Sequence, residues 1–280
     1  MTTEHQNHPD NLTISFIGGG NMARALIGGM LQQGVSASRI NVIESDAEKR
    51  NQLQHDFNVS VTEQLPSAAA SDVIVLAVKP QQLRDVSIFL GSLLKDQLII
   101  SIAAGVRSGD LARWLGGYEA IVRVMPNTPA QIQAGVSALF AASGVSPRQK
   151  QQAESLMQAV GVTLWLDEEA RMDAVTAISG SGPAYVFYLI EAMQEAAAAL
   201  GFSAEEAKML SLQTFAGATR LAMQSDENPA TLRHQVTSKG GTTERAIQSL
   251  EAAGVKAAIS AAAHAAAQRS KELGDLLGAE

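Results

Sequence analysis

The chain has 280 residues, 46% of them hydrophobic and 18% charged, which is enough apolar material for one large or two modest globular domains. A net charge of −7 and the lack of a dense Lys/Arg cluster argue against a nucleic-acid partner. The absence of cysteine excludes disulfides, thiolate catalysis and cysteine-bound zinc, and it suits a reducing cytoplasm. We expect no metal site and no membrane span, and residues 1–11 have the polar composition of a disordered tail.

The stretch from Leu12 to Ala23 has the pattern of a strand, a glycine-rich turn and a helix. Gly18, Gly20 and Ala23 fit the G-x-G-x-x-G/A fingerprint of a dinucleotide site. The first glycine permits the tight turn, and the second lets a pyrophosphate approach the backbone at the helix N-terminus. An ordinary glycine-rich turn is the alternative interpretation.

The second predicted strand, Ile40–Glu44, ends where a dinucleotide fold meets the adenosine ribose. Glu44 could accept hydrogen bonds from the ribose 2′-hydroxyl, which favours NADH. Lys49 and Arg50 lie just beyond and could tolerate the 2′-phosphate of NADPH, and Glu44 could also be a solvated residue at the strand end. Both NADH and NADPH therefore stay open as cofactors.

Alternating apolar strands and helices predict an α/β fold for residues 12–166, a Rossmann domain with a doubly wound parallel sheet. Ligands of such sheets lie beyond the carboxyl ends of the strands, where Lys79-Pro80, Ala103-Ala104 and the Pro126–Pro129 segment fall. The remaining predicted strands are Val59–Val61, Val73–Val78, Leu98–Ile102, Ile121–Met125, Gly135–Ala141 and Gly161–Leu166, and the predicted helices begin at Asn21 and span Ala47–Phe57 and Pro147–Ala159.

Residues 167–280 read as a second, all-α domain. The first half of the first long helix is apolar nearly all round, which predicts that this helix is deeply buried. A helical unit of roughly 110 residues offers only a modest core by itself, so we expect a homodimer through these helices. A wholly intramolecular core is the alternative. The predicted helices are Ala184–Leu200, Ala204–Gln224, Thr243–Ala253 and Val255–Leu277.

Two breaks interrupt this helical half. The Ser179–Pro183 segment predicts a helix start, with Ser181 as N-cap and Pro183 in the first turn. The Thr237–Thr243 segment combines hydroxyl groups, Lys239 and two adjacent glycines directly before a helix. Such a loop can hold an anion through its N–H groups, either a phosphate or a carboxylate. A flexible loop between helices is the alternative.

The available side chains favour reduction of a C=N bond over reduction of a carbonyl. A carbonyl needs an acid to protonate the developing alkoxide, whereas a protonated imine carries its own positive charge. His55, His234 and His264 are poorly placed for acid catalysis, although Lys79 could act as an acid.

Six motifs together resemble the pyrroline-5-carboxylate reductase family. They agree in order and spacing over almost the whole chain, from about Leu12 to the last helix. The resemblance implies NAD(P)H-dependent reduction of 1-pyrroline-5-carboxylate to L-proline, a C-terminal dimerisation domain and active sites at the dimer interface. In part of the family the dimers assemble further, often into decamers. The motifs are GGGNMA at 18–23, AVKP at 77–80, SIAAGV at 101–106, RVMPNTP at 123–129, SGSGPAYVF at 179–187 and TSKGGTT at 237–243.

The resemblance also implies roles for individual residues. Thr243 would bind near the ring nitrogen, and Lys79 and Thr243 are the catalytic candidates. The substrate carboxylate would lie at Ser238, Gly240, Gly241, Thr242 and Thr243. The cofactor would contact Gly18, Gly19, Gly20, Asn21, Met22, Glu44, Ala77, Val78, Lys79, Pro80, Ala103, Ala104, Asn127 and Thr128.

Two positions depart from the family pattern. Lys239 stands where proline is usual, which frees an N–H and adds a positive charge beside the anion. Glu44-Ser45 stands where many relatives carry Asn-Arg, a pair suited to a 2′-phosphate. Two other functions stay open: a dehydrogenase of small hydroxy acids, disfavoured because the Ala184–Leu200 helix has no lysine, and a nucleotide sensor without turnover.

Overall fold

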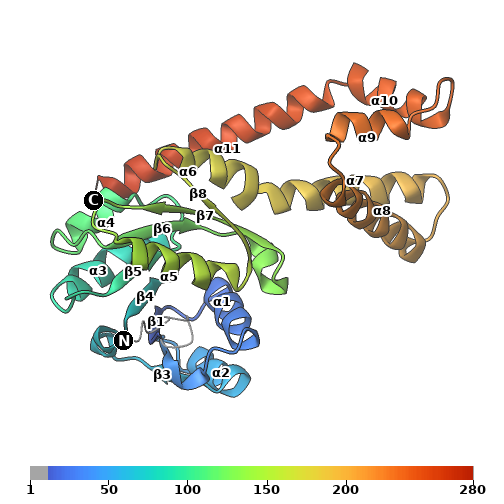
Figure 1. Cartoon of the computed structure of the whole chain (residues 1–280). Coiled ribbons are helices and arrows are strands. Elements are labelled where there is room, and N and C mark those ends of the chain that lie inside the picture. The colour runs from blue at the N-terminus through green and yellow to red at the C-terminus, as the bar shows by residue number, and fades with distance from the viewer. Residues whose placement is uncertain (1–11, 280) are drawn as a thin grey trace, which may run out of the picture. The chain divides into compact units, whose positions relative to one another are not determined.

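The computed structural model describes residues 12–279, so the tail predicted at residues 1–11 lies outside the described residues. Figure 1 shows the strands in the first part of the chain and helices alone in the last. The elements are β1 (Ile14–Ile17), α1 (Asn21–Gln32), β2 (Ile40–Ile43), α2 (Ala47–Phe57), β3 (Ser60–Thr62), β4 (Val73–Leu76), α3 (Pro80–Gly91), β5 (Leu98–Ser101), α4 (Ser108–Trp114), β6 (Ile121–Met125), β7 (Gly135–Ala141), α5 (Pro147–Gln158), β8 (Gly161–Trp165), α6 (Arg171–Val175), α7 (Gly182–Ala199), α8 (Ala204–Gln224), α9 (Pro229–Gln235), α10 (Thr242–Ala252) and α11 (Val255–Gly278).

The described chain divides into two compact units. The first unit runs to Ser181 and includes the chain from Ala266 onward, and the second is Gly182–Ala265. Helix α11 therefore contributes to both units. None of the helices among residues 12–279 has the length and apolar character that crossing a membrane requires.

Within the described residues, eight strands form one sheet in the order β3-β2-β1-β4-β5-β6-β7-β8. Strands β1 to β6 pair in parallel, and β1 lies between β2 and β4, with Ile14 opposite both Ile40 and Val73. The order of the strands reverses at β1, which makes the carboxyl end of β1 the topological switch point where such sheets bind ligands. The predicted Rossmann sheet is confirmed.

The closing strands depart from the parallel pattern. Strand β7 runs antiparallel to β6, and β8 runs parallel to β7. The connection from Met125 to Gly135 holds only a short 3-10 helix, Thr128–Ile132. A parallel crossover needs about a dozen residues or more, so this short connection returns the chain in the opposite direction.

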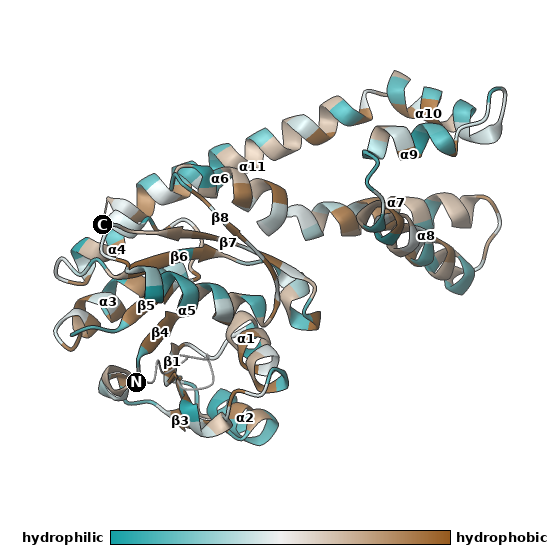
Figure 2. Ribbon diagram, in the orientation of Figure 1, coloured by the Kyte–Doolittle hydropathy of each residue, from teal (hydrophilic) through white to brown (hydrophobic). Residues whose placement is uncertain are grey.

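Both faces of the sheet are buried, which explains the uninterrupted apolar strands. In β4, Val73 and Val75 join the core formed with α1, α2 and α5. Ile74 and Leu76 face the other way and join the core formed with α3 and α4. Because alternate side chains of a strand point to opposite faces, each of the four must be apolar. Figure 2 shows this apolar character along the strands.

The chain enters α7 differently from the prediction. It is helical from Arg171 and passes through a π-helical turn, Thr176–Gly180, before α7. The N–H of Ser181 donates to the Thr176 carbonyl at 2.7 Å, five residues back. Ser181 has a right-handed helical backbone, so it lies inside a helical run and the predicted N-cap is wrong.

The apolar side chains of α7 are not buried in the single chain. Phe187 is 65% exposed and Tyr188 71% exposed. No residue of α7 is buried, so the prediction of deep burial is wrong for one chain alone. Contiguous exposed aromatic surface of this kind marks an interaction site.

Candidate active site

The glycine turn after β1 is held between the ends of β2 and β4. The Gly18 N–H donates to the Ile43 carbonyl at 2.8 Å. Gly18 has φ +100°, and a Cβ there would lie 2.7 Å from the Ala77 carbonyl oxygen. Only glycine fits, because both the positive φ and the close strand exclude a side chain. Ala23, 1% exposed, packs the new helix closely against the sheet.

The helix that follows starts with open amides. Its N-cap is Gly20, which has an extended backbone and no side chain to accept hydrogen bonds from the amides of the first turn. A Cβ at Gly20 would meet no atom within 4 Å, so a ligand can approach the backbone. The free N–H groups and the positive end of the helix dipole suit a pyrophosphate.

A pocket of about 480 Å³ opens beside this turn. It brings together half of the residues predicted to bind the cofactor, namely Gly18, Gly19, Gly20, Glu44, Ala77, Val78 and Lys79. Its lining also includes Lys49, which the sequence placed beside the ribose, and Ser45, Asp46 and Gln82, which we did not predict to bind the cofactor. Helix α3, which carries Gln82, was missed, although Pro80 at its first position is a recognisable start signal.

The Glu44 carboxylate binds the glycine turn itself. Glu44 is 9% exposed, and its Oε2 accepts the Gly19 N–H at 2.9 Å. Its Oε1 accepts the Asp46 N–H at 3.0 Å. Asp46 caps α2, and hydrogen bonds from the backbone of Lys49 and Glu48 lower the pKa of its carboxyl group. Two carboxylates therefore line the part of the pocket predicted to receive the ribose.

Arg50 is not available to this pocket. Its Nη1 donates to the backbone carbonyls of Glu44 at 2.7 Å and Ser45 at 2.8 Å. Its Nη2 lies 3.4 Å from the Glu63 carboxylate, and the side chain is 19% exposed. Arg50 stabilises the end of β2 and the start of α2, which leaves Lys49 as the basic residue of α2 that lines the pocket.

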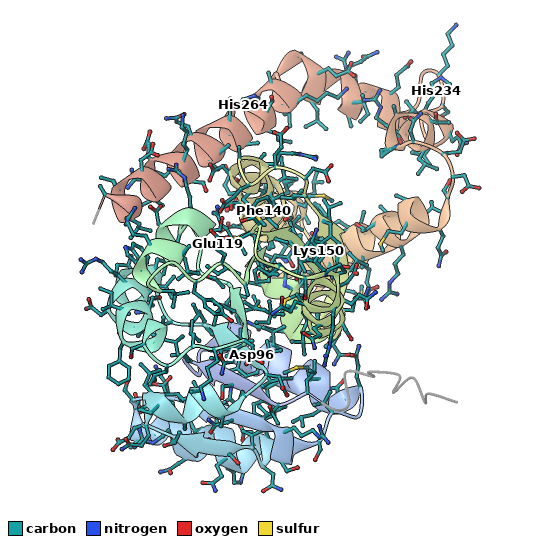
Figure 3. All side chains as sticks on the ribbon, turned by 60° about the vertical axis from the view of Figure 1, so that its left-hand side comes forward. Asp96, Glu119, Phe140, Lys150, His234 and His264 are labelled. Carbon is teal, nitrogen blue, oxygen red and sulfur yellow. The ribbon has the colours of Figure 1, made fainter. Side chains whose placement is uncertain are left out.

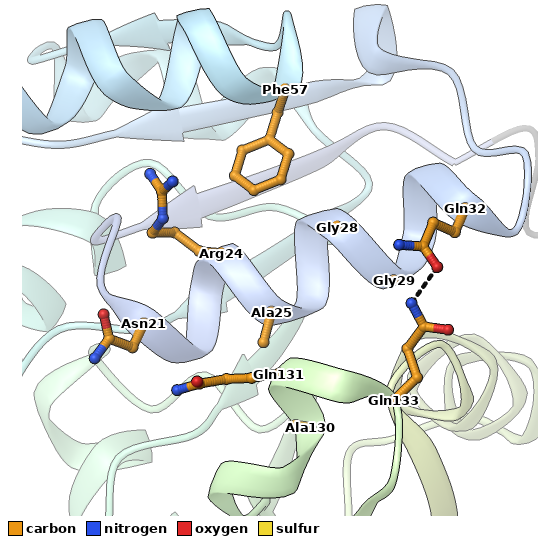
Figure 4. A pocket seen from close by; sticks show the side chains of 10 residues that line it. All are labelled: Asn21, Arg24, Ala25, Gly28, Gly29, Gln32, Phe57, Ala130, Gln131 and Gln133. Carbon is orange, nitrogen blue, oxygen red and sulfur yellow. Dashed lines mark hydrogen bonds between the residues drawn. The ribbon is translucent and has the colours of Figure 1, made fainter.

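The other predicted cofactor residues are absent from the lining of this pocket. Asn21 lines a second cavity of about 390 Å³, shown in Figure 4, between α1, Phe57 and the segment Ala130–Gln133. Arg24 in that cavity pairs with Asp56 and lies over the Phe57 ring, so its charge is already used. Met22 and Ala103 pack against the apolar cores, Pro80 begins α3, and Ala104 follows β5.

The Asn127 side chain joins three segments of the first unit. Its Nδ2 donates to the Ser179 carbonyl in the π-helical turn at 3.1 Å, and its Oδ1 accepts the Val136 N–H at 2.9 Å. Both polar groups of the Asn127 amide therefore have hydrogen-bond partners within the chain. Thr128, the next residue, is exposed at the start of a 3-10 helix.

We expect the Asn127→Ala substitution to lower stability by about 1–2 kcal/mol, because it leaves two partly buried backbone groups without a partner. The melting temperature should fall by about 2–4 °C. Asn127→Asp keeps an acceptor for the Val136 N–H and should lose less stability than Asn127→Ala. An unchanged melting temperature with a raised KM for the nucleotide would show that the amide acts on the cofactor instead.

The predicted anion loop lies in the second unit, between α9 and α10. Helix α9 was missed, although Asn228 caps it and Pro229 begins it. A hydrogen bond of 3.0 Å from the Gly241 N–H to the Ser238 carbonyl closes a turn in this loop. Gly241 then serves as the extended N-cap of α10, which begins at Thr242, one residue before the prediction.

The three histidines among residues 12–279 are all exposed and lie on α2, α9 and α11. His55 is 88% exposed on α2. His234 and His264, labelled in Figure 3, lie on α9 and α11. His234 is exposed, and His264 Nδ1 lies 2.7 Å from the Ser260 carbonyl of its own helix.

Comparison with known families gives two matches. Residues 169–273 match the model described as pyrroline-5-carboxylate reductase dimerisation. Residues 13–105 match the model described as NADP oxidoreductase, coenzyme F420-dependent. The first match covers α7 to α10 and most of α11, and the second covers the strands around the glycine turn.

Individual relatives match over nearly their full length. A pyrroline-5-carboxylate reductase of Pseudomonas aeruginosa is 50% identical over 267 residues, 95% of this chain and 98% of that protein. A solved structure of a pyrroline-5-carboxylate reductase from Coxiella burnetii is similar with a TM-score of 0.88 at 42% identity, covering 94% and 98% of the two chains. A structure of the Plasmodium falciparum pyrroline carboxylate reductase, solved with NADP bound, is similar with a TM-score of 0.85 at 29% identity. The match covers 95% of this chain and 99% of that chain.

Proposed function

The chain belongs to the pyrroline-5-carboxylate reductase family, and from this premise we propose that it reduces 1-pyrroline-5-carboxylate to L-proline, the last step of proline biosynthesis. The observation that carries the proposal is 50% identity to a reductase of this name over 95% of the chain. The similarity includes both the glycine turn and the loop before α10. We further propose the cytoplasm as its location.

The first unit would hold the reduced nicotinamide nucleotide, which supplies the hydride when bound. The open amides after Gly20 receive the pyrophosphate, and Glu44 lies where the ribose is expected. Ala77 and Val78 line the pocket beyond β4. Ala103-Ala104 and Asn127-Thr128 would contact the nicotinamide, as the family resemblance implies. Positioning of this kind supplies much of the rate, because it replaces a bimolecular encounter.

The loop before α10 would hold the substrate by its carboxylate. Ser238, Gly240 and Gly241 shape the turn, and the amides of Thr242 and Thr243 begin the helix. The hydride adds to the imine carbon while the ring nitrogen keeps its proton, so the product is a secondary amine. Thr243 orients the nitrogen, and Lys79, which lines the nucleotide pocket, is the candidate acid that protonates the imine nitrogen before the hydride adds. Hydride transfer requires that the nucleotide and the loop before α10 act on the same substrate molecule. We therefore propose that the active site is complete in the assembled oligomer.

The direct test is oxidation of NADH, followed by absorbance, with pyrroline-5-carboxylate as substrate and chromatographic measurement of L-proline. We expect one L-proline for each NADH oxidised. Turnover of a small hydroxy acid instead would support the dehydrogenase. Nucleotide binding without turnover of any cyclic imine would support the sensor.

We propose that the enzyme prefers NADH, because Glu44 and Asp46 line the pocket and Arg50 is engaged elsewhere. Glu44→Ala should raise the ratio of kcat/KM for NADPH to that for NADH about ten-fold, since it removes both repulsion of the 2′-phosphate and an acceptor for the 2′-hydroxyl. Glu48→Ala, an exposed neighbour in α2, is the matched control. An unchanged ratio in the Glu44 variant would exclude Glu44 from cofactor selection.

We propose residues 12–166 as the nucleotide-binding domain and 167–280 as the dimerisation domain. The exposed apolar side chains of α7, including Phe187 and Tyr188, support a homodimer through the helices. Assembly of these dimers into a decamer is a further proposal. Light scattering of the purified chain distinguishes the monomer, the dimer and the decamer.

A further inference from the structure

Glu244 places a carboxylate of the chain itself at the proposed substrate loop. It is the third residue of α10, and its Oε2 accepts the Gly240 N–H at 2.7 Å. A glutamate at this helical position commonly reaches back to the N-cap amide. Here the Gly241 N–H already donates to the Ser238 carbonyl, so the Glu244 carboxylate accepts from the N–H of the preceding residue, Gly240.

The hydrogen bonds divide the amides of the loop into two groups. The N–H groups of Gly240 and Gly241 have partners, Glu244 and Ser238. In the chain from 12 to 279, the amides of Thr242 and Thr243 have no such partner, as expected for the first turn of a helix. Thr242 is exposed and Thr243 half-buried, so both can be reached by a ligand.

We propose that Glu244 is a positioning residue that fixes where the substrate carboxylate binds. By occupying the Gly240 amide, it confines that carboxylate to the amides of Thr242 and Thr243. This inference rests on the proposed function, since it concerns the same loop.

The negative charge of Glu244 has a second consequence. Among the described residues Glu244 forms no ion pair, and Lys239 and Arg245 beside it are both exposed. A substrate carboxylate at the next amides therefore meets a like charge within one helical turn. The charge lowers affinity for the anion while the hydrogen bond holds the loop in register.

The test compares Glu244→Gln with Glu244→Ala. Glutamine keeps an acceptor for the Gly240 amide but removes the charge. For Glu244→Gln we expect the KM for pyrroline-5-carboxylate and the inhibition constant for L-proline to be roughly five-fold lower than in the wild-type chain. This is the factor by which two like charges about 4 Å apart in water weaken binding. This gain should shrink at 0.5 M NaCl, where the Debye length is roughly 4 Å.

Alanine removes the charge and also frees the Gly240 amide. L-proline should again bind more tightly, but kcat should fall at least about five-fold below that of the glutamine variant, because the carboxylate then has a second place to bind. Loss of a structural contact alone would not tighten binding. Glu251→Gln makes the same charge change at the other end of α10 and also removes the ion pairs of Glu251 with Arg233 and Lys256, so it controls for net charge, and melting temperatures check folding.

Unchanged or raised constants in Glu244→Gln at low salt would overturn the role of the charge. Equal kcat values in the glutamine and alanine variants would overturn the positioning role. The proposed function fails separately, if the wild-type chain does not reduce pyrroline-5-carboxylate at all.

Discussion

Replacing Gly241 by valine should reduce kcat/KM for pyrroline-5-carboxylate by about a hundred-fold. A Cβ at this position would lie 2.5 Å from Ser238 Oγ and 3.1 Å from the Ser238 carbonyl oxygen. The Ser238 side chain would have to rotate and its carbonyl would have to shift by a few tenths of an ångström, while the valine methyl groups would crowd the turn and the space proposed for the substrate carboxylate. Displacement of the turn moves the amides of α10 that we propose to hold the substrate, and a misplacement of about 1 Å can cost this factor.

The nucleotide pocket serves as the internal control for this variant. It lies in the first unit, so the dissociation constant for NADH, measured by fluorescence, should stay within about two-fold of the wild-type value. Circular dichroism should show unchanged helix content. Proline formation at the normal rate by a folded Gly241→Val protein would exclude the loop as the substrate site.

Replacing Thr243 by valine should lower kcat/KM by at least ten-fold and up to about a hundred-fold. Valine has nearly the same shape as threonine, so the change removes the hydroxyl group and little else. A hydrogen bond made in the transition state lowers kcat and kcat/KM together when it is lost. The loss should thus appear in kcat.

Thr243→Ser retains the hydroxyl group and should recover most of the activity. The amide of residue 243 is present in all three proteins, so binding of the carboxylate should change little. A Thr243→Val enzyme with wild-type kcat/KM would remove the hydroxyl from the mechanism.

Helices, strands and turns that are determined by neighbouring residues could be predicted from the sequence. Helix α2 spans Ala47–Phe57 as predicted, because Asp46 caps its start and Asn58 takes the left-handed conformation at its end. The buried strands were recognised because both faces of the sheet require apolar residues, as in β4. The glycine turn followed from its fingerprint.

Features that depend on distant residues could not be predicted in the same way. Arg50 was a candidate for a phosphate until the structure showed it bound to the carbonyls of Glu44 and Ser45. The Ser179–Pro183 segment has the composition of a helix start, but the π-helical turn Thr176–Gly180 runs into it. Asn127, from the segment after β6, donates a hydrogen bond to that turn. The apolar residues of α7 predicted a buried helix, but contacts within one chain do not bury it, and a pattern within one helix cannot identify what would cover it.

A crystal structure with L-proline and oxidised NAD bound tests the central claim most directly. The account predicts the carboxylate of L-proline against the amides of Thr242 and Thr243, with its ring beside the nicotinamide. An L-proline carboxylate bound elsewhere, with these amides facing only solvent, would contradict it.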